Sequence, residues 1–73
     1  MNIEDVDLFL ELSKNQNLTV TANNLFLTQP TVSRRLAMLE RDLGYSLFIR
    51  GKGYGTISLT AAGKRFSTIA QQI

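Results

Sequence analysis

The stretch from Thr28 to Gly44 is the most constrained part of this 73-residue chain. Its apolar side chains recur at spacings of four, three and four residues, which is the period of one face of an α-helix. These side chains are Val32, Leu36, Leu39 and Leu43. Thr28 can cap the first turn, Pro30 suits that turn because it lacks an N–H, and Gly44 favours a helix stop. The pattern predicts a helix over residues 28–43 with one narrow buried stripe.

Two helices are predicted before this one. Residues 4–14 carry apolar side chains at three- and four-residue spacing, which indicates an amphipathic helix. Thr19 is expected to cap a short second helix that ends near Leu25. Only Phe26 and Leu27 separate the second helix from the third, so the turn is sharp and Leu27 is expected at its buried corner. Two short helices joined in this way define a helix-turn-helix.

The hydrophobic period changes after residue 44. Two β-prone segments, residues 45–50 and 56–59, flank a turn that contains three glycines, and this arrangement predicts a β-hairpin. Thr60 is then expected to cap a last helix that runs to residue 73. The sequence therefore predicts a mainly α fold: a winged helix-turn-helix of three helices, a two-stranded hairpin as the wing, and the start of a further helix.

Composition excludes several classes of function. The chain has neither cysteine nor histidine, which removes disulfides, thiolate metal ligands and the usual general base. We therefore expect no metal, no cofactor and no enzymatic activity. The longest apolar runs are three residues, far below the roughly 18 needed to cross a bilayer, and early acidic residues do not suit a signal peptide. A cytoplasmic binding or interaction module is expected.

Charge is distributed unevenly along the chain. Residues 1–27 contain four acidic side chains and one basic side chain, for a net charge of −3. Residues 28–73 contain seven basic and two acidic side chains, for a net charge of +5. This asymmetry favours binding of a polyanion or an acidic surface by the second part. A basic face that is merely solvated explains the charge alone equally well.

The outward side of the predicted third helix is small or basic. A helix about 10–12 Å across fits the major groove of B-DNA, which is roughly 12 Å wide. In such a groove Gln29 can pair with adenine, Arg34 with guanine, and the ring of Pro30 can touch a thymine methyl. Thr31 and Ser33 offer short hydroxyls that suit phosphates. The alternative is an ordinary surface helix with two arginines.

Other basic residues have two interpretations each. Arg35 lies near the edge of the apolar stripe, so we expect a salt bridge to an acid of the first helix. Arg50 can contact a phosphate or pair with Glu40. Lys52 can contact DNA from the hairpin, at the backbone or in the minor groove, or it can be a solvated turn residue. Tyr54 can simply cover the hairpin.

Several short motifs follow one another along the chain. They are Leu18-Thr19-Val20-Thr21-Ala22, Leu25, Thr28-Gln29-Pro30-Thr31-Val32-Ser33-Arg34, Leu39-Glu40, Leu43-Gly44, Leu47-Phe48, Arg50 and Leu59-Thr60-Ala61-Ala62-Gly63. In this order they resemble the N-terminal winged helix-turn-helix of LysR-type transcriptional regulators. The resemblance covers essentially the whole chain. It departs at Asn23, where the family usually has a second alanine.

The resemblance implies sequence-specific binding of double-stranded DNA for bacterial transcription regulation. By this resemblance the helix over 28–43 reads the major groove, and the basic wing over 50–56 lies at the backbone or in the minor groove. The residues matched to base reading are Gln29, Pro30, Ser33 and Arg34. Those matched to phosphates or the wing are Thr28, Thr31, Arg50 and Lys52. A winged-helix protein-interaction module that uses its basic face on an acidic partner is the alternative.

The resemblance also divides the chain and suggests its partners. Residues 1–59 match the DNA-binding domain, and residues 60–73 match the start of a linker helix through which the family forms homodimers. Phe66, Ile69 and Ala70 give this last helix an apolar side for such a contact. The alternative is that this side packs within its own chain. A small-molecule effector is expected only through a C-terminal domain that this chain lacks, as if the chain were a fragment of a longer regulator.

Overall fold

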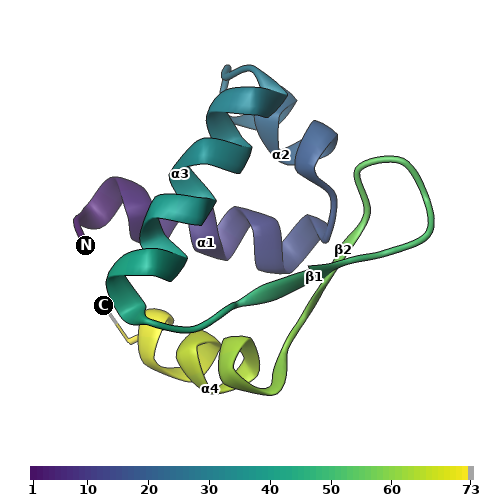
Figure 1. Ribbon diagram of the computed structural model, residues 1–73. Helices are drawn as coiled ribbons and strands as arrows, with labels where there is room; N and C mark the ends of the chain where they lie inside the picture. The colour runs from purple at the N-terminus through teal and green to yellow at the C-terminus, as the bar shows by residue number, and fades with distance from the viewer. Residues whose placement is uncertain (73) are drawn as a thin grey trace.

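The computed structural model describes residues 1–72 as four helices and one β-hairpin (Figure 1). The elements, in chain order, are α1 (Ile3–Asn15), α2 (Leu18–Asn24), α3 (Gln29–Leu43), β1 (Phe48–Arg50), β2 (Ile57–Leu59) and α4 (Ala61–Ala70). This order and the two-stranded antiparallel sheet confirm the predicted winged helix-turn-helix. The last helix ends at Ala70, earlier than predicted, and residue 73 lies outside the described residues.

The first helix begins with a reciprocal cap. The Asn2 side-chain oxygen accepts the Asp5 N–H at 2.9 Å, and the Asp5 carboxylate accepts the Asn2 N–H at 3.3 Å. The helix ends where Gln16 adopts a left-handed conformation, with φ of 52°. These two ends extend α1 by one residue on each side of the predicted range.

The cap predicted for α2 was wrong. Asn17, not Thr19, caps this helix, because the Asn17 side-chain oxygen accepts the N–H groups of Thr19 at 2.9 Å and Val20 at 3.0 Å. The turn to α3 passes through Phe26, which is 95% exposed and has a φ of 58°. Leu27 follows, half-buried against the core at the corner of the turn.

Helix α3 has the ends that the sequence predicts. The Thr28 hydroxyl accepts the Thr31 N–H at 3.3 Å, and Pro30 lies in the first turn. At the other end Gly44 has a φ of 86° and donates its N–H to the Glu40 carbonyl at 2.8 Å. The predicted stripe faces inward, fully at Val32, Leu36 and Leu39 and in part at Leu43.

Phe9 lies at the centre of the core and is wholly buried. Its ring is 5.5 Å from the ring of Phe48 in β1 and 4.9 Å from that of Phe66 in α4, the latter pair meeting edge to face. Figure 1 shows α4 on the opposite side of α1 from α2. Phe9 therefore joins the hairpin and the last helix to the three-helix body.

Helix α4 is fixed to the connection between α3 and β1. The Thr60 hydroxyl caps the helix by accepting the Gly63 N–H at 2.9 Å, and it also donates to the Ser46 carbonyl at 2.7 Å. A Cβ atom at Gly63 would overlap the Leu47 carbonyl oxygen. This close approach explains why a glycine follows the two alanines of the motif.

The hairpin is shorter than predicted and is held at both ends. Phe48 pairs with Leu59, and Arg50 pairs with Ile57. The far end lies against the α1–α2 link, where the Ile57 N–H donates to the Gln16 carbonyl at 3.0 Å. Residues 45–47 do not extend β1, because they form the connection from α3.

None of the helices in residues 1–72 is long and apolar enough to span a membrane.

Candidate nucleic-acid interface

The first two turns of α3 present the residues that the sequence assigned to base reading. Pro30 and Arg34 are exposed, while Gln29 and Ser33 are half-buried. Pro30 and Arg34 point away from Val32, which is completely buried, while Gln29 and Ser33 lie between these two directions. Because residues four apart share a helix face, Pro30 lies in line with Arg34, and Gln29 with Ser33. The structure therefore brings these four residues together on one accessible side of α3.

The hydroxyls of Thr28 and Thr31 lie together at the start of α3. Their Oγ1 atoms are 2.8 Å apart, and Thr28 Oγ1 also accepts the Thr31 N–H. Thr28 is exposed and Thr31 is half-buried. A helix N-terminus carries partial positive charge and unsatisfied N–H groups, which favour an anion. This end of α3 is therefore suited to a phosphate beside the outward side of α3.

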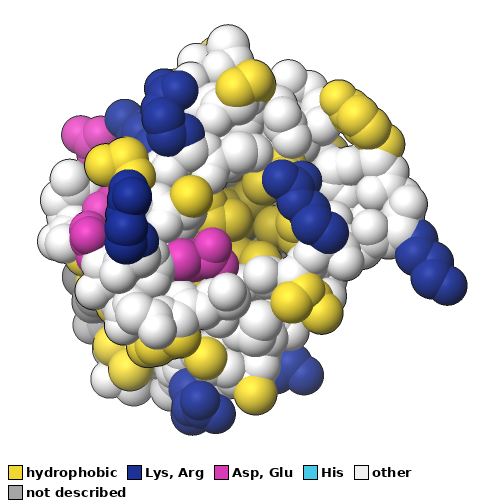
Figure 2. Space-filling model, in the orientation of Figure 1, with side chains coloured by type: hydrophobic (Ala, Val, Ile, Leu, Met, Phe, Trp, Pro, Cys, Tyr) yellow, Lys and Arg dark blue, Asp and Glu magenta, His cyan; other side chains and the backbone are white. Residues whose placement is uncertain are grey.

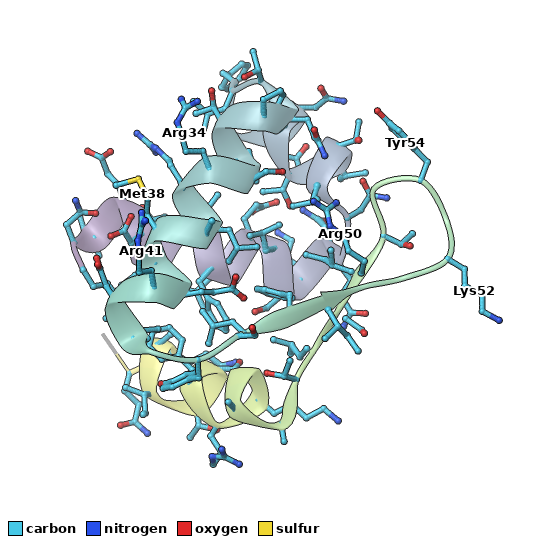
Figure 3. All side chains as sticks on the ribbon, viewed as in Figure 1. Arg34, Met38, Arg41, Arg50, Lys52 and Tyr54 are labelled. Carbon is cyan, nitrogen blue, oxygen red and sulfur yellow. The ribbon has the colours of Figure 1, made fainter. Side chains whose placement is uncertain are left out.

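The two adjacent arginines of α3 lie in different environments. Arg35 Nη2 is 3.5 Å from Glu4 Oε2 of α1, which confirms the predicted salt bridge. Arg34 points outward, on the side of α3 that also carries Met38 and Arg41 (Figure 3). Met38 is 49% exposed. Arg34 is thus available to a ligand, whereas Arg35 ties two helices.

The hairpin carries its basic side chains outward. Arg50, in β1, and Lys52, at the tip, are both exposed. Figure 3 shows Lys52 extending away from the body of the molecule and Tyr54 projecting from the other side of the tip. Tyr54 is 87% exposed, so it does not cover the hairpin as one interpretation held.

A hollow of about 110 Å³ separates α3 from the hairpin. Its lining consists of Leu18, Ser33, Leu36, Glu40, Phe48, Ile49, Arg50 and Ile57. Figure 2 shows an apolar floor here, with an acidic and a basic side chain at its edge and further Lys and Arg side chains spaced around this face. The hollow faces the same side as the outward surface of α3, so the two elements frame one concave surface.

Glu40 is the residue of this surface whose role the sequence did not reveal. Its Oε2 atom accepts the backbone N–H groups of Leu47 at 2.6 Å and Phe48 at 3.2 Å. Within residues 1–72 no ion pair joins Glu40 to Arg50, so the guanidinium of Arg50 is left for another partner. The two donors lie seven and eight residues further along the chain, beyond a turn, and no local pattern indicates them.

The apolar side of α4 faces mainly its own chain. Phe66 and Ala70 are buried in the core, while Ile69 is 57% exposed. Two of the three residues assigned to a dimer contact are thus occupied within the monomer, as the alternative interpretation held. Ile69 alone of the three is accessible to a second copy. Asn23, where the sequence departs from the family, is exposed, so its amide is hydrated and needs no buried partner.

Three short helices, the tight turn between α2 and α3, and a hairpin beside the exposed side of α3 define a winged helix-turn-helix protein. The family described as bacterial regulatory helix-turn-helix protein, lysR family, matches residues 3–64. The chain belongs to this LysR family, as its motifs predicted. Among the described residues no group of acidic side chains is arranged to hold a metal ion.

Curated relatives align over the whole of this chain but extend well beyond it. HdfR, a transcriptional regulator of Shigella boydii, is 38% identical over 73 residues, which are all of this chain and 25% of that protein. IlvY of Escherichia coli K12 is 35% identical over 72 residues, which are 99% of this chain and 24% of that protein. The chain spans about a quarter of the length of the curated relatives it matches.

Solved structures of the same fold include DNA complexes. The complex of the CbnR DNA-binding domain with DNA has a TM-score of 0.89 and 32% identity, covering 99% of this chain and 80% of that one. Vibrio fischeri DarR in complex with DNA has a TM-score of 0.89 and 33% identity, covering 99% of this chain and 24% of that one. The BenM DNA-binding domain on its benA site 1 DNA has a TM-score of 0.88, with 29% identity, 99% coverage of this chain and 81% of that one.

Proposed function

We propose that this chain binds double-stranded DNA in a sequence-specific manner and so regulates transcription. Helix α3 enters the major groove, and the hairpin over residues 50–56 lies at the backbone or in the minor groove. The observation that carries this proposal is the exposure of Pro30 and Arg34 on the side of α3 opposite the buried Val32. Similar proteins of the same fold, CbnR, DarR and BenM, were solved with DNA, which supports it.

The side chains on α3 can distinguish bases by their chemistry. The guanidinium of Arg34 can donate two hydrogen bonds to O6 and N7 of guanine, and Gln29 can both donate to and accept from adenine. Pro30 is exposed and can contact the methyl group of thymine. Ser33 can bond to a base edge or a phosphate from the floor of the same surface. Together they form the base-reading set of the proposal.

The other polar residues hold the protein on the duplex. Thr28 and Thr31 lie at the positive end of α3, where a phosphate is favoured. Arg50 borders the hollow and Lys52 lies at the tip, so both can approach the sugar-phosphate backbone beside the groove that α3 occupies. Such contacts position the protein and carry no sequence information directly.

The alternative function, docking of an acidic protein partner, is less well supported. Protein interfaces are rich in large aromatic residues at their centre. Among the described residues, the exposed outward side of α3 carries one large apolar side chain, Met38, beside small and basic neighbours. The DNA complexes of similar proteins also favour a nucleic-acid partner.

We also propose partners beyond DNA for this chain. A homodimer would use the exposed Ile69 of α4, since Phe66 and Ala70 are taken up by the core. A small-molecule effector would act only through a C-terminal domain and not through residues 1–73. The site of action would be the cytoplasm, where bacterial promoters are located. No enzymatic role is proposed, and the relatives are named as transcriptional regulators.

Fluorescence anisotropy with a labelled random duplex tests the proposal. At low salt the chain should bind this duplex, and added salt should weaken binding steeply, because condensed counterions are released from the DNA. An acidic protein whose net negative charge is similar to that of the duplex serves as the competitor. No binding of duplex DNA at low salt would contradict the proposal and favour a protein partner.

A further inference from the structure

Glu40 joins the end of α3 to the beginning of the hairpin. Its backbone carbonyl accepts the N–H of Gly44, which closes the helix. Its side-chain Oε2 accepts the N–H groups of Leu47 and Phe48, which lead into β1. Hydrogen bonds to an ionised acceptor are roughly twice as strong as neutral ones, and Glu40 is half-buried, where water competes less. One residue therefore fixes both sides of the connection.

The segment that Glu40 holds also carries a proposed DNA contact. Phe48 packs against Phe9 in the core, and Arg50 follows two residues later on the same face of the strand. The position of Arg50 relative to α3 therefore depends on how β1 leaves the helix. The other strand is held by backbone bonds to the α1–α2 link, in which Ile57 and Gln16 take part. Loss of the Glu40 bonds would loosen the start of β1, at Leu47 and Phe48, while the pairing of β1 with β2 remains.

Electrostatics alone would disfavour an acid at this place. Glu40 lines the hollow together with Ser33 and Arg50, on the surface that the proposed function gives to a polyanion. A negative charge there repels phosphate, so its removal should strengthen DNA binding if charge were its only effect. A structural benefit must offset this repulsion, and the two backbone bonds provide one.

We propose that Glu40 is a positioning residue for DNA recognition. Its carboxylate fixes the position of β1, and with it Arg50, relative to α3. Both elements can then contact the same duplex at the same time. The proposal rests on the proposed DNA-binding function. It predicts that removal of this acid weakens specific binding, which is the opposite of what charge alone predicts.

Three variants of the full chain separate these effects. Glu40→Ala removes both hydrogen bonds, whereas Glu40→Gln removes the charge but keeps an acceptor oxygen. Asp42→Asn removes the same charge from an exposed position of the same helix. The Asp42 side chain has no hydrogen bond within residues 1–72. The measurements are amide hydrogen exchange by NMR and anisotropy with two labelled duplexes, one selected from a random pool and one random.

The expected results differ in sign among the variants. In Glu40→Ala the amides of Leu47 and Phe48 should exchange about tenfold faster, while that of Ile57 should not change. Its affinity for the selected duplex should fall about tenfold relative to the random duplex. In Glu40→Gln the ratio of selected to random affinity should fall by less than in Glu40→Ala. Asp42→Asn should bind both duplexes slightly more tightly.

Two results would overturn the proposal. One is unchanged exchange at Leu47 and Phe48 in a folded Glu40→Ala chain. The other is a ratio of specific to random affinity that is the same in Glu40→Ala as in the wild-type chain, while the wild-type chain binds DNA. A wild-type chain that binds neither duplex would contradict the proposed function itself, and the exchange data would still show whether Glu40 holds β1.

Discussion

The guanidinium of Arg35 lies 3.5 Å from the carboxylate of Glu4, and this ion pair ties α3 to α1. The preceding residue, Arg34, forms no ion pair within residues 1–72 and faces solvent. Neighbouring arginines of equal charge thus differ in their surroundings because they are about 100° apart around the helix. This difference supplies a matched pair of substitutions for testing the base-reading side of α3.

Arg34→Ala should lower affinity for a selected duplex by about 1–3 kcal/mol and relax the base preference at one position. The physical reason is the loss of a bidentate contact to guanine. Arg35→Ala is the control: it removes an exposed ion pair worth at most about 1 kcal/mol of stability and should affect selected and random duplexes alike. Fluorescence anisotropy with both duplexes measures the affinities of the two variants. Equal losses on the two duplexes in Arg34→Ala would count against base reading.

Lys52→Ala should weaken binding to all duplexes to the same extent. A phosphate contact releases counterions, so loss of this contact should reduce the slope of log K against log salt by about 1 for each bound copy of the chain. If each copy of a dimer neutralises roughly three phosphates, the wild-type slope should be near −5. Lys64→Ala, which removes an exposed lysine from α4, serves as the control. An unchanged slope in Lys52→Ala would show that Lys52 is only solvated.

The exposed side of α4 predicts self-association that depends on Ile69. Ile69→Asp should shift the chain towards monomer in sedimentation equilibrium at micromolar concentration, with its fold unchanged by circular dichroism. Phe66→Ala should instead destabilise the fold by about 3–5 kcal/mol, because it removes the ring that meets Phe9 edge to face and leaves a cavity in the core. A wild-type chain that stays monomeric would contradict association through Ile69.

Hydrogen bonds lower the pKa of Glu11 below its ordinary value of 4.5. The amide of Asn24 contributes most, that of Asn15 next and the charge of Lys14 least, while burial acts in the opposite direction. A lowered pKa means that this contribution to stability is complete above pH 4.5 and is lost as the pH falls through the folded-state value.

Urea unfolding between about pH 5 and pH 3 tests this dependence. Glu11→Gln should make the stability less dependent on pH over that interval, because the variant has no carboxyl to protonate. Asp7→Asn, an exposed acid of α1 with no hydrogen bond in the described chain, is the matched control. A Glu11→Gln chain with the wild-type pH dependence would rule out a role for these hydrogen bonds.

Local signals made α3 the most predictable element. Its cap, its proline, its apolar spacing and its terminal glycine all lie within residues 28–44, so no distant contact was needed to place it. The pairing of Arg35 with α1 followed from its place at the edge of the apolar stripe. The start of α2 did not follow in the same way, because Asn17 and Thr19 are both good caps. In the structure Asn17, which caps α2, also forms a β-bridge with Thr56 of the hairpin.

Features that depend on distant parts of the chain were harder to predict. The role of Glu40 needs donors from beyond the turn, and the burial of Phe66 needs the position of Phe9 at the other end of the chain. The apolar spacing of α4 predicted one buried side but not whether that side packs within the monomer. The three-residue strands are short because the α3–β1 connection is held by Glu40 and Thr60 and does not pair with another strand.

Selection of bound duplexes from a random pool is the most direct test of sequence-specific recognition by α3. With the wild-type chain, the recovered duplexes should share one motif that contains a guanine, and Arg34→Ala should lose the preference at that base while keeping the rest. A pool recovered from the wild-type chain without any enriched motif, although the chain binds duplex DNA, would contradict the account.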